Sequence, residues 1–158
     1  MWKWCAVWKR SISADMERKP YLHQVHYYET DQMAIVHHSN YIRWFEEARC
    51  DFMDQIGVSY QSVEARGILI PVVDVSCSYL ISARYGDQME IRPILTQYTG
   101  VRMSFRYEVR FAADGRLAAT GTSSHCFLDE NRRPVSMKRR DPALHALLES
   151  LVETKTER

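Results

Sequence analysis

The hydrophobic and polar positions of this chain change their period along the sequence in a readable order. Residues 41–53 carry bulky apolar side chains at steps of three and four, which predicts a helix with one apolar face; these are Tyr41, Trp44, Phe45, Ala48, Phe52 and Met53. Ser39 or Asn40 can cap the start of this helix, and Gly57 fits just past its end. Because the apolar face is wide and bulky, we expect the helix to lie against a sheet.

Strand-like patterns flank this helix on both sides. Residues 21–28 precede it and look like a first strand rich in aromatic side chains. After the helix the period becomes two, first at residues 73–79 and most clearly at residues 102–111, where apolar and polar positions alternate. The pair Asp114-Gly115 marks a tight hairpin turn, so we expect the partner strand at residues 117–128.

Weaker signals complete the predicted arrangement. A short second helix is expected at residues 59–66 and an amphipathic one at 142–152, while Tyr85-Gly86-Asp87 and Thr99-Gly100 separate the remaining strands. The order is strand, long helix, four strands in a meander and a terminal helix, which predicts an α+β fold with a five-stranded antiparallel sheet. One helix can hardly cover five strands, so we expect a homodimer or a homotetramer.

The composition fits a globular protein with a core of its own. The chain has 158 residues, of which 46% are hydrophobic and 26% are charged. A net charge of +1 argues against nucleic-acid binding. Four scattered cysteines predict reduced thiols in a cytoplasmic protein. No apolar run reaches the ~18 residues of a membrane helix, so no membrane span is expected.

The first residues differ from the rest. Three tryptophans crowd together with lysine and arginine in the first ten positions, without the apolar run of a signal peptide. We expect residues 1–18 to be an N-terminal extension outside the fold, and residues 19–158 to form a single domain. A membrane-surface or partner-binding role for the extension is the alternative.

Reactive side-chain types gather between the first strand and the long helix. Asp31, His37, His38 and Asn40 lie in or just after the predicted loop at residues 29–39. Backbone N–H groups at a helix start have no intrahelical acceptor and carry partial positive charge, so they can stabilise an oxyanion. A carboxylate nearby can serve as general base or nucleophile. These two features suffice for acyl transfer from a thioester, because a thiolate leaves readily, and no metal or cofactor is expected.

Each of these residues also has a plainer interpretation. Asp31 alone is more often a turn or capping residue, and His37-His38 alone is more often a solvated pair. Side chains of adjacent histidines diverge on ordinary backbone, and no H-E-x-x-H motif is present, so no metal site is predicted. A cysteine nucleophile is disfavoured because the cysteines within the predicted elements are expected to be buried and inert. The G-x-S-x-G motif of a serine hydrolase is absent from the sequence.

An ordered set of residues around this loop resembles the signature of the 4-hydroxybenzoyl-CoA thioesterase-like branch of the hotdog superfamily, which includes the Tol–Pal-cluster acyl-CoA thioesterases. The matching residues are Tyr28, Thr30-Asp31, Ile35-Val36, His38, Asn40-Tyr41 and Trp44-Phe45-Glu46-x-Ala48-Arg49. Downstream matches are Ala83-Arg84-Tyr85-Gly86-Asp87, Ser104-Phe105-x-Tyr107-Glu108-Val109, Gly121-Thr122-Ser123-Ser124-His125 and Arg133-Pro134-Val135. The resemblance spans residues 21–137 and implies a hotdog fold, in which the sheet wraps around the long helix, here followed by a C-terminal helix.

The resemblance also implies roles for single residues. By position, Asp31 is implied to be the catalytic carboxylate, and the backbone N–H of His38 to polarise the thioester carbonyl. Asn40 and Tyr41 are implied to frame the pocket and to start the helix. The family usually has Gly where this chain has Ala34, and Gly tolerates backbone conformations that Ala resists. We therefore expect Ala34 in place of Gly to affect the backbone geometry of the loop that carries Asp31.

A basic stretch near the end of the chain is a second candidate site. Arg133 and Lys138 belong to a run of five cations within nine positions. Arginine and lysine suit phosphate, so we expect contact with the phosphates of coenzyme A, with Arg84 and Arg102 helping from neighbouring strand ends. A solvated tail is the plainer interpretation of such a run.

The sequence therefore favours hydrolysis of an acyl-CoA thioester to the free acid and CoA. The alternative is a hotdog protein that binds acyl-CoA or an acyl carrier protein without turning it over. A hotdog hydratase is disfavoured, because that chemistry needs a catalytic histidine with Asp or Glu in a different signature. The pattern specifies neither the acyl group nor the packing of the oligomer.

Overall fold

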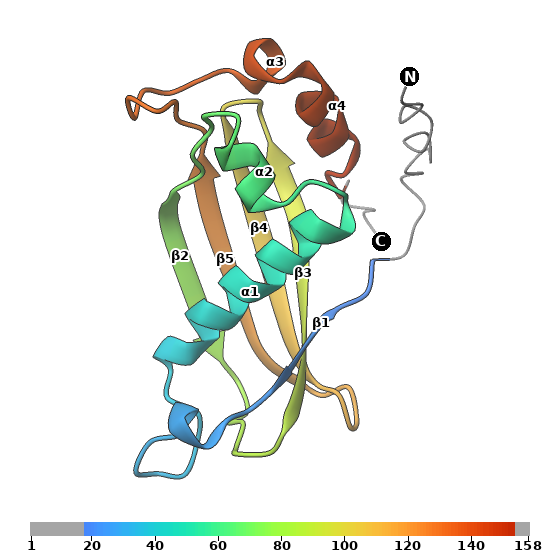
Figure 1. The fold of residues 1–158 in the computed structure, drawn as a ribbon. Coiled ribbons are helices and arrows are strands. Elements are labelled where there is room, and N and C mark those ends of the chain that lie inside the picture. Colours follow the sequence, from blue (N-terminus) through green and yellow to red (C-terminus); the bar gives the residue numbers. More distant parts are fainter. Residues whose placement is uncertain (1–17, 154–158) are drawn as a thin grey trace, which may run out of the picture.

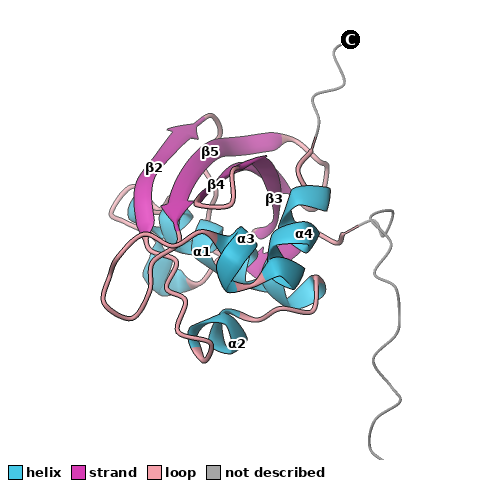
Figure 2. Ribbon diagram, turned by 90° about the horizontal axis from the view of Figure 1, so that it is seen from above, coloured by secondary structure: helices cyan, strands magenta, loops and turns pink. Residues whose placement is uncertain are grey.

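One long helix lies across the concave face of a five-stranded antiparallel sheet (Figures 1 and 2). The structure is a computed structural model that describes residues 18–153. The strands are β1 (Tyr21–Gln24), β2 (Val72–Tyr79), β3 (Gln88–Tyr98), β4 (Arg102–Phe111) and β5 (Leu117–Cys126). The helices are η1 (Tyr27–Glu29, a 3-10 turn), α1 (Ser39–Gln55), α2 (Tyr60–Glu64), α3 (Met137–Arg140) and α4 (Pro142–Ser150). This arrangement confirms the predicted α+β class, the five-stranded sheet and the C-terminal helix.

The order of the strands differs from the predicted meander. The sheet runs β1-β3-β4-β5-β2, so only β3, β4 and β5 follow one another, and β2 lies beyond β5 at one edge. The prediction of four strands in a meander was therefore wrong. Alternation of apolar and polar positions reports which side chains face the core, and it carries no information on which strand is the neighbour.

The first strand is shorter than predicted. β1 ends at Gln24, and the chain turns through η1, where Tyr27 and Tyr28 are 78% and 77% exposed. At the other end of the fold, β5 ends at Cys126, and Leu128 makes isolated bridges to Leu69 and Pro134. Nearly all of the predicted N-terminal extension lies outside the described residues.

The core lies between α1 and the sheet. Trp44, Phe45 and Phe52 of α1 are buried, and the ring of Phe45 stacks on Tyr107 of β4 with centroids 4.4 Å apart. Gly121 of β5 faces the same ring, and a Cβ at that position would lie 2.3 Å from it. The absence of a side chain at Gly121 thus lets the helix approach the sheet closely.

Strand β2 is the exposed edge of the sheet. Seven of its eight residues are exposed, among them Val72, Val73, Val75 and Tyr79. Its outer edge pairs with no other strand of the described residues. An open apolar strand edge of this kind is typical of an interface with another chain.

Within residues 18–153, no helix is both long enough and apolar enough to cross a bilayer.

Candidate active site

The loop that carries Asp31 is a tight hairpin. Thr30 and Val36 form a β-bridge at its base, and Asp31 N–H donates to the carbonyl of Ile35 at 2.9 Å. Ala34 N–H donates back to the carbonyl of Asp31 at 2.9 Å, and Met33 N–H donates to Oδ1 of the Asp31 carboxylate at 2.8 Å. Asp31 therefore does serve as a turn residue through one oxygen. Its second oxygen, Oδ2, accepts no hydrogen bond from the described residues and is available for chemistry.

Ala34 adopts the conformation that the family's glycine would suit. Its φ is 59°, in the left-handed region that L-residues other than Gly, Asn and Asp rarely enter. The hairpin combines a tight turn with a left-handed residue after it, a geometry that favours Gly at that position. Ala34 therefore places strain of about 1 kcal/mol in the loop that carries the candidate carboxylate.

The start of α1 presents a free backbone amide, that of His38. Neither Ser39 nor Asn40 caps the helix, so that prediction was wrong; the capping position is His38, whose side chain makes no capping bond. Ser39 Oγ instead pairs with Nδ1 of His37 at 2.8 Å. The N–H of His38 has no acceptor within the described residues, while its carbonyl accepts a hydrogen bond from the hydroxyl of Tyr79 at 3.0 Å. Burial raises the pKa of Tyr79 to about 12, so this hydroxyl keeps its proton and remains a donor.

The two adjacent histidines lie side by side. The ring centroids of His37 and His38 are 4.1 Å apart, so the expectation that their side chains diverge was wrong. The bond from Ser39 to Nδ1 of His37 accompanies this arrangement. Among the described residues, no group of three or more His, Cys, Asp or Glu side chains could hold a metal ion.

Asn40 and Tyr41 are buried against the helix start. The side-chain amide of Asn40 donates to the carbonyls of Glu29 at 2.9 Å and His37 at 3.3 Å. Tyr41 is 3% exposed and packs between Trp44 and Tyr79, with ring centroids 4.6 and 5.1 Å away. Both residues thus shape the helix start, and both N–H bonds of the Asn40 amide are used inside the protein.

The predicted coenzyme A contacts fall into two groups at opposite ends of the sheet. Arg84 follows β2, next to Ala83, whose carbonyl accepts the N–H of Val36 at 2.8 Å and so joins the Asp31 loop. Arg102 begins β4 at the other end, where it pairs with the last residue of β5. Arg133 and Lys138 lie at that same far end, which the connection from β5 to α3 occupies (Figure 1). All four side chains are exposed. Within one chain the structure does not bring them together.

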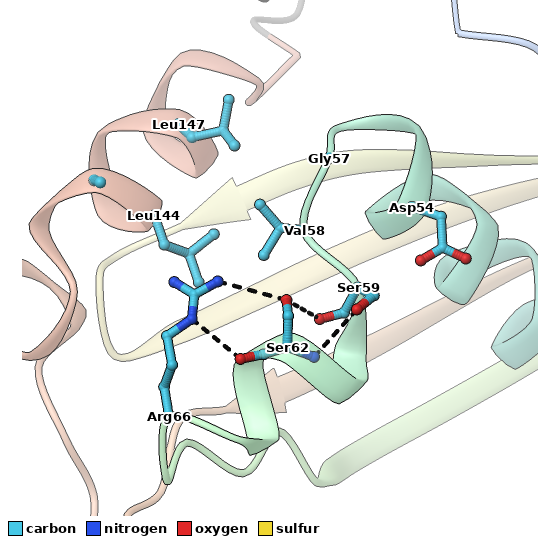
Figure 3. Close-up of a pocket in the computed structure, with 9 residues that line it drawn as sticks. Asp54, Gly57, Val58, Ser59, Ser62, Arg66, Leu144 and Leu147 are labelled. Atoms are coloured by element: carbon cyan, nitrogen blue, oxygen red, sulfur yellow. Dashed lines mark hydrogen bonds between the residues drawn. The ribbon is translucent and has the colours of Figure 1, made fainter. Parts of the chain in front are cut away.

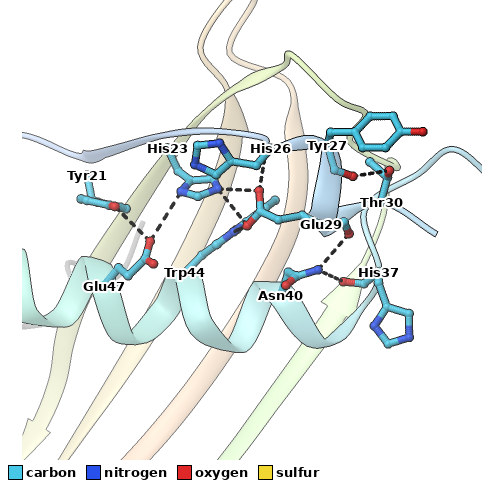
Figure 4. Close-up of polar contacts among 10 residues, drawn as sticks. All are labelled: Tyr21, His23, His26, Tyr27, Glu29, Thr30, His37, Asn40, Trp44 and Glu47. Atoms are coloured by element: carbon cyan, nitrogen blue, oxygen red, sulfur yellow. Dashed lines mark hydrogen bonds and ion pairs between the residues drawn. The ribbon is translucent and has the colours of Figure 1, made fainter.

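A buried carboxylate beside the loop escaped the sequence prediction. Glu29 is 4% exposed and accepts hydrogen bonds from His23, His26 and Trp44 (Figure 4). The predicted strand at residues 21–28 hid this cluster. The step of three from His26 to Glu29 fits a turn better than an extended strand, and this was the available signal.

A cavity among the described residues lies away from Asp31. It has a volume of about 620 Å³ and opens between the C-terminal end of α1, α2 and α4 (Figure 3). Val58, Leu144 and Leu147 supply its apolar lining, and its serines are occupied with one another, since Ser62 Oγ donates to the carbonyl of Ser59 at 2.7 Å. Because Asp31 lies beyond the opposite end of α1, this cavity is not part of the candidate site.

A five-stranded antiparallel sheet wrapped around one central helix defines the hotdog class of folds. The family model of the Thioesterase-like superfamily matches residues 25–150, so the chain belongs to this family.

Individual relatives support the assignment. The chain is similar to the putative acyl-CoA thioesterase YneP of Bacillus subtilis, with 35% identity over 80% of this chain and 91% of that protein. It is similar to the solved structure of a DHNA-CoA thioesterase from Staphylococcus aureus, with a TM-score of 0.79 and 30% identity over 83% of this chain and 88% of the other. A hypothetical protein from Thermus thermophilus gives a TM-score of 0.74 and 33% identity over 85% of this chain and 97% of the other.

Proposed function

We propose that this protein hydrolyses acyl-CoA thioesters, with Asp31 as the catalytic carboxylate and the N–H of His38 as a donor to the oxyanion. One observation carries the proposal. A carboxylate oxygen and a helix-start amide, both without partners in the described residues, belong to one loop whose two ends are joined by backbone hydrogen bonds. The family membership and the relatives named as acyl-CoA thioesterases support the substrate class.

Two routes fit this arrangement. As a general base, Asp31 takes a proton from water while the water oxygen bonds to the thioester carbon, and the carbonyl electrons move to the oxygen that faces His38 N–H. As a nucleophile, Asp31 itself bonds to the carbon and forms an anhydride that water then opens. In both routes the C–S bond breaks and CoA leaves as the thiolate. Single-turnover hydrolysis in ¹⁸O-water distinguishes them, because only the nucleophilic route puts label into the Asp31 carboxylate.

The open edge of β2 supports a dimer in which the two chains share each site. Two copies of β2 that pair antiparallel about a two-fold axis bring the Tyr79 end of one strand beside the Val72 end of the other. Val72 pairs with His125 near the end of β5, after which the chain continues to Arg133 and Lys138. The partner's basic segment would then lie near the Asp31 loop, and the two groups of predicted CoA contacts would meet across the interface.

Binding without turnover is the second candidate, and Ala34 is the observation that favours it. A strained residue three positions after Asp31 can hold the carboxylate away from a reacting carbon, since misplacement of about 1 Å can cost ~100-fold in rate. In that case the protein would bind acyl-CoA or an acyl carrier protein and release no CoA.

The first test compares Asp31→Asn with a matched control, Asp114→Asn. Asp114 also accepts the N–H of the residue two positions on, Arg116, at 3.0 Å, so both substitutions perturb the same kind of turn. Across a panel of short, long and aromatic acyl-CoAs, we expect Asp31→Asn to lose ~100-fold or more in kcat and Asp114→Asn to stay within about twofold of wild type. Wild-type turnover by Asp31→Asn would remove Asp31 from the mechanism. Binding of acyl-CoA without CoA release by the wild type would favour the second candidate.

The second test asks whether the sites are shared. Chains carrying Asp31→Asn are mixed and refolded with chains carrying Arg133→Ala and Lys138→Ala. If the basic segment serves the partner's site, each mixed dimer contains one intact site and activity returns above that of either variant alone. If the segment serves its own chain, mixing restores nothing. Sedimentation equilibrium of the wild type gives the number of chains in the assembly.

A further inference from the structure

Glu29 joins three elements beside the candidate site through its side chain. Nε2 of His23 on β1 lies 2.9 and 3.1 Å from its two carboxylate oxygens. The backbone N–H of His26 donates to Oε2 at 2.7 Å, and the indole Nε1–H of Trp44 on α1 donates to Oε1 at 2.8 Å (Figure 4). One carboxylate thus connects the first strand, the η1 turn and the long helix.

The backbone of Glu29 holds the other end of the loop. Its carbonyl accepts the N–H of His37 at 2.8 Å and the side-chain amide of Asn40 at 2.9 Å. His37 is the residue before His38, and Glu29 stands two positions before Asp31. Each of the two groups that would act on the thioester is therefore one or two residues away from a position fixed by the Glu29 backbone.

The contacts require an acceptor at this position. An indole N–H and a backbone N–H can only donate, so the carboxylate must present oxygen to both. Burial acts to raise the pKa of Glu29, but the hydrogen bonds from His23, His26 and Trp44 outweigh it and lower the pKa below its ordinary value. The buried Glu29 carboxylate is thus an anion that accepts hydrogen bonds from three N–H groups whose directions are fixed. Such a group fixes geometry, because any movement leaves a buried N–H without a partner.

We propose that Glu29 is a positioning residue for thioester hydrolysis, whose buried carboxylate sets the spacing between Asp31 and the N–H of His38. It touches no substrate and acts through the loop and the helix start. The chemistry rests on the proposed function, whereas the positioning is a property of the fold.

Glu29→Gln tests this proposal with little change in volume. Gln keeps one oxygen but turns an NH₂ group toward the remaining donors, so one of the three hydrogen bonds is replaced by a donor facing a donor. We expect kcat to fall at least tenfold while KM changes less than about threefold, since binding through distant CoA contacts is untouched. The amide NMR resonances of Asp31 and His38 and the indole N–H resonance of Trp44 should all shift.

Glu47→Gln is the matched control. Glu47 touches the same histidine, with Oε2 3.5 Å from Nδ1 of His23, and accepts from the Tyr21 hydroxyl at 2.9 Å, but within the described residues none of its hydrogen bonds or ion pairs reaches the loop. We expect it to leave kcat and the resonances of Asp31 and His38 unchanged. Wild-type kcat in Glu29→Gln would overturn the proposal, as would a loss of activity that follows the folded fraction alone. If the wild type hydrolyses no thioester, the proposed function fails; unshifted loop resonances in Glu29→Gln would show separately that the positioning fails.

Discussion

Helix α1 carries two buried polar clusters of opposite charge, and they are built differently. Near its start, the Glu29 carboxylate is held by ring and backbone N–H groups, whose directions are fixed. In its middle, Arg49 is 6% exposed, and its guanidinium donates to the hydroxyls of Tyr60 at 2.8 Å and Tyr107 at 3.2 Å. Hydroxyls can rotate to find other partners. The first cluster therefore specifies a geometry, and the second tolerates changes.

The Arg49 cluster contains no carboxylate, and its hydrogen bonds have a direction. Because Arg49 can only donate, the Tyr107 oxygen accepts from it, and the Tyr107 hydroxyl has Ser123 Oγ 2.7 Å away as an acceptor; Ser123 Oγ in turn lies 2.8 Å from Nε2 of His125. With the Ser123 hydroxyl as the donor to Nε2, the proton of neutral His125 lies on Nδ1, and a hydrogen bond to the backbone of Pro71 acts to raise the pKa of His125. Burial and the Arg49 charge lower the pKa of His125 to about 4.

The largest expected effect comes from deleting the carboxylate of the first cluster. Glu29→Ala leaves the N–H groups of His23, His26 and Trp44 without an acceptor in the core. We expect the free energy of unfolding to fall by about 3–5 kcal/mol, measured by urea denaturation at pH 7. A loss below 1 kcal/mol would show that these donors find other partners, and the contrast between the clusters would not hold.

The next effect is a pH dependence that belongs to the second cluster. The pKa of His125 is lower in the folded chain than in the unfolded chain, so between about pH 6.5 and 4 the unfolded state binds more protons. Stability is therefore retained above pH 6.5 and falls by about 2 kcal/mol between pH 7 and pH 5. His125→Gln should remove this part of the slope in urea titrations at the two pH values. An unchanged slope in the variant would assign the dependence to other groups.

Removing the charge of the second cluster should have a smaller effect. Arg49→Met replaces a buried cation with an apolar chain of similar length and leaves three hydroxyl-bearing residues that can pair with one another. Replacement of buried charges by apolar groups is often neutral or stabilising, so we expect a change within about 1.5 kcal/mol in either direction. If Arg49→Met lowered the free energy of unfolding as much as Glu29→Ala, the Arg49 cluster would be no more tolerant of change than the Glu29 cluster.

The smallest effect concerns the loop that the first cluster holds. Ala34→Gly relieves the left-handed strain at φ 59° but adds freedom to the unfolded chain, so we expect a gain of about 0.5–1 kcal/mol in thermal or urea unfolding. If the strain also misplaces Asp31, kcat should rise in the same variant. Lower stability in Ala34→Gly would show that the methyl group makes contacts that outweigh the strain.

Periodicity in the sequence predicted the elements of the fold well, whereas the pairing of the strands could not be predicted from it. Alternation located residues 102–111 as a strand, and steps of three and four located α1 within two residues. The neighbour of β2 could not be predicted, since strand order depends on contacts far apart in the chain. The candidate site was partly predictable, because Asp31 and His38 belong to one ordered signature, from which Ala34 departs. Glu29 was not, because its role depends on Trp44, fifteen residues away, and on burial that the pattern did not show.

The exposed edge of β2 affects the solubility of the newly synthesised chain. Its sequence Val-Val-Asp-Val-Ser-Cys-Ser-Tyr carries a single charge, Asp74, and the register shift between Val72 and Asp74 is the one irregularity that interrupts it. Such an edge recruits any other open strand, whether it belongs to a second copy or to an unrelated nascent protein. If two copies of β2 pair as proposed, assembly competes with aggregation, and dilution favours the single chain in which this edge is exposed.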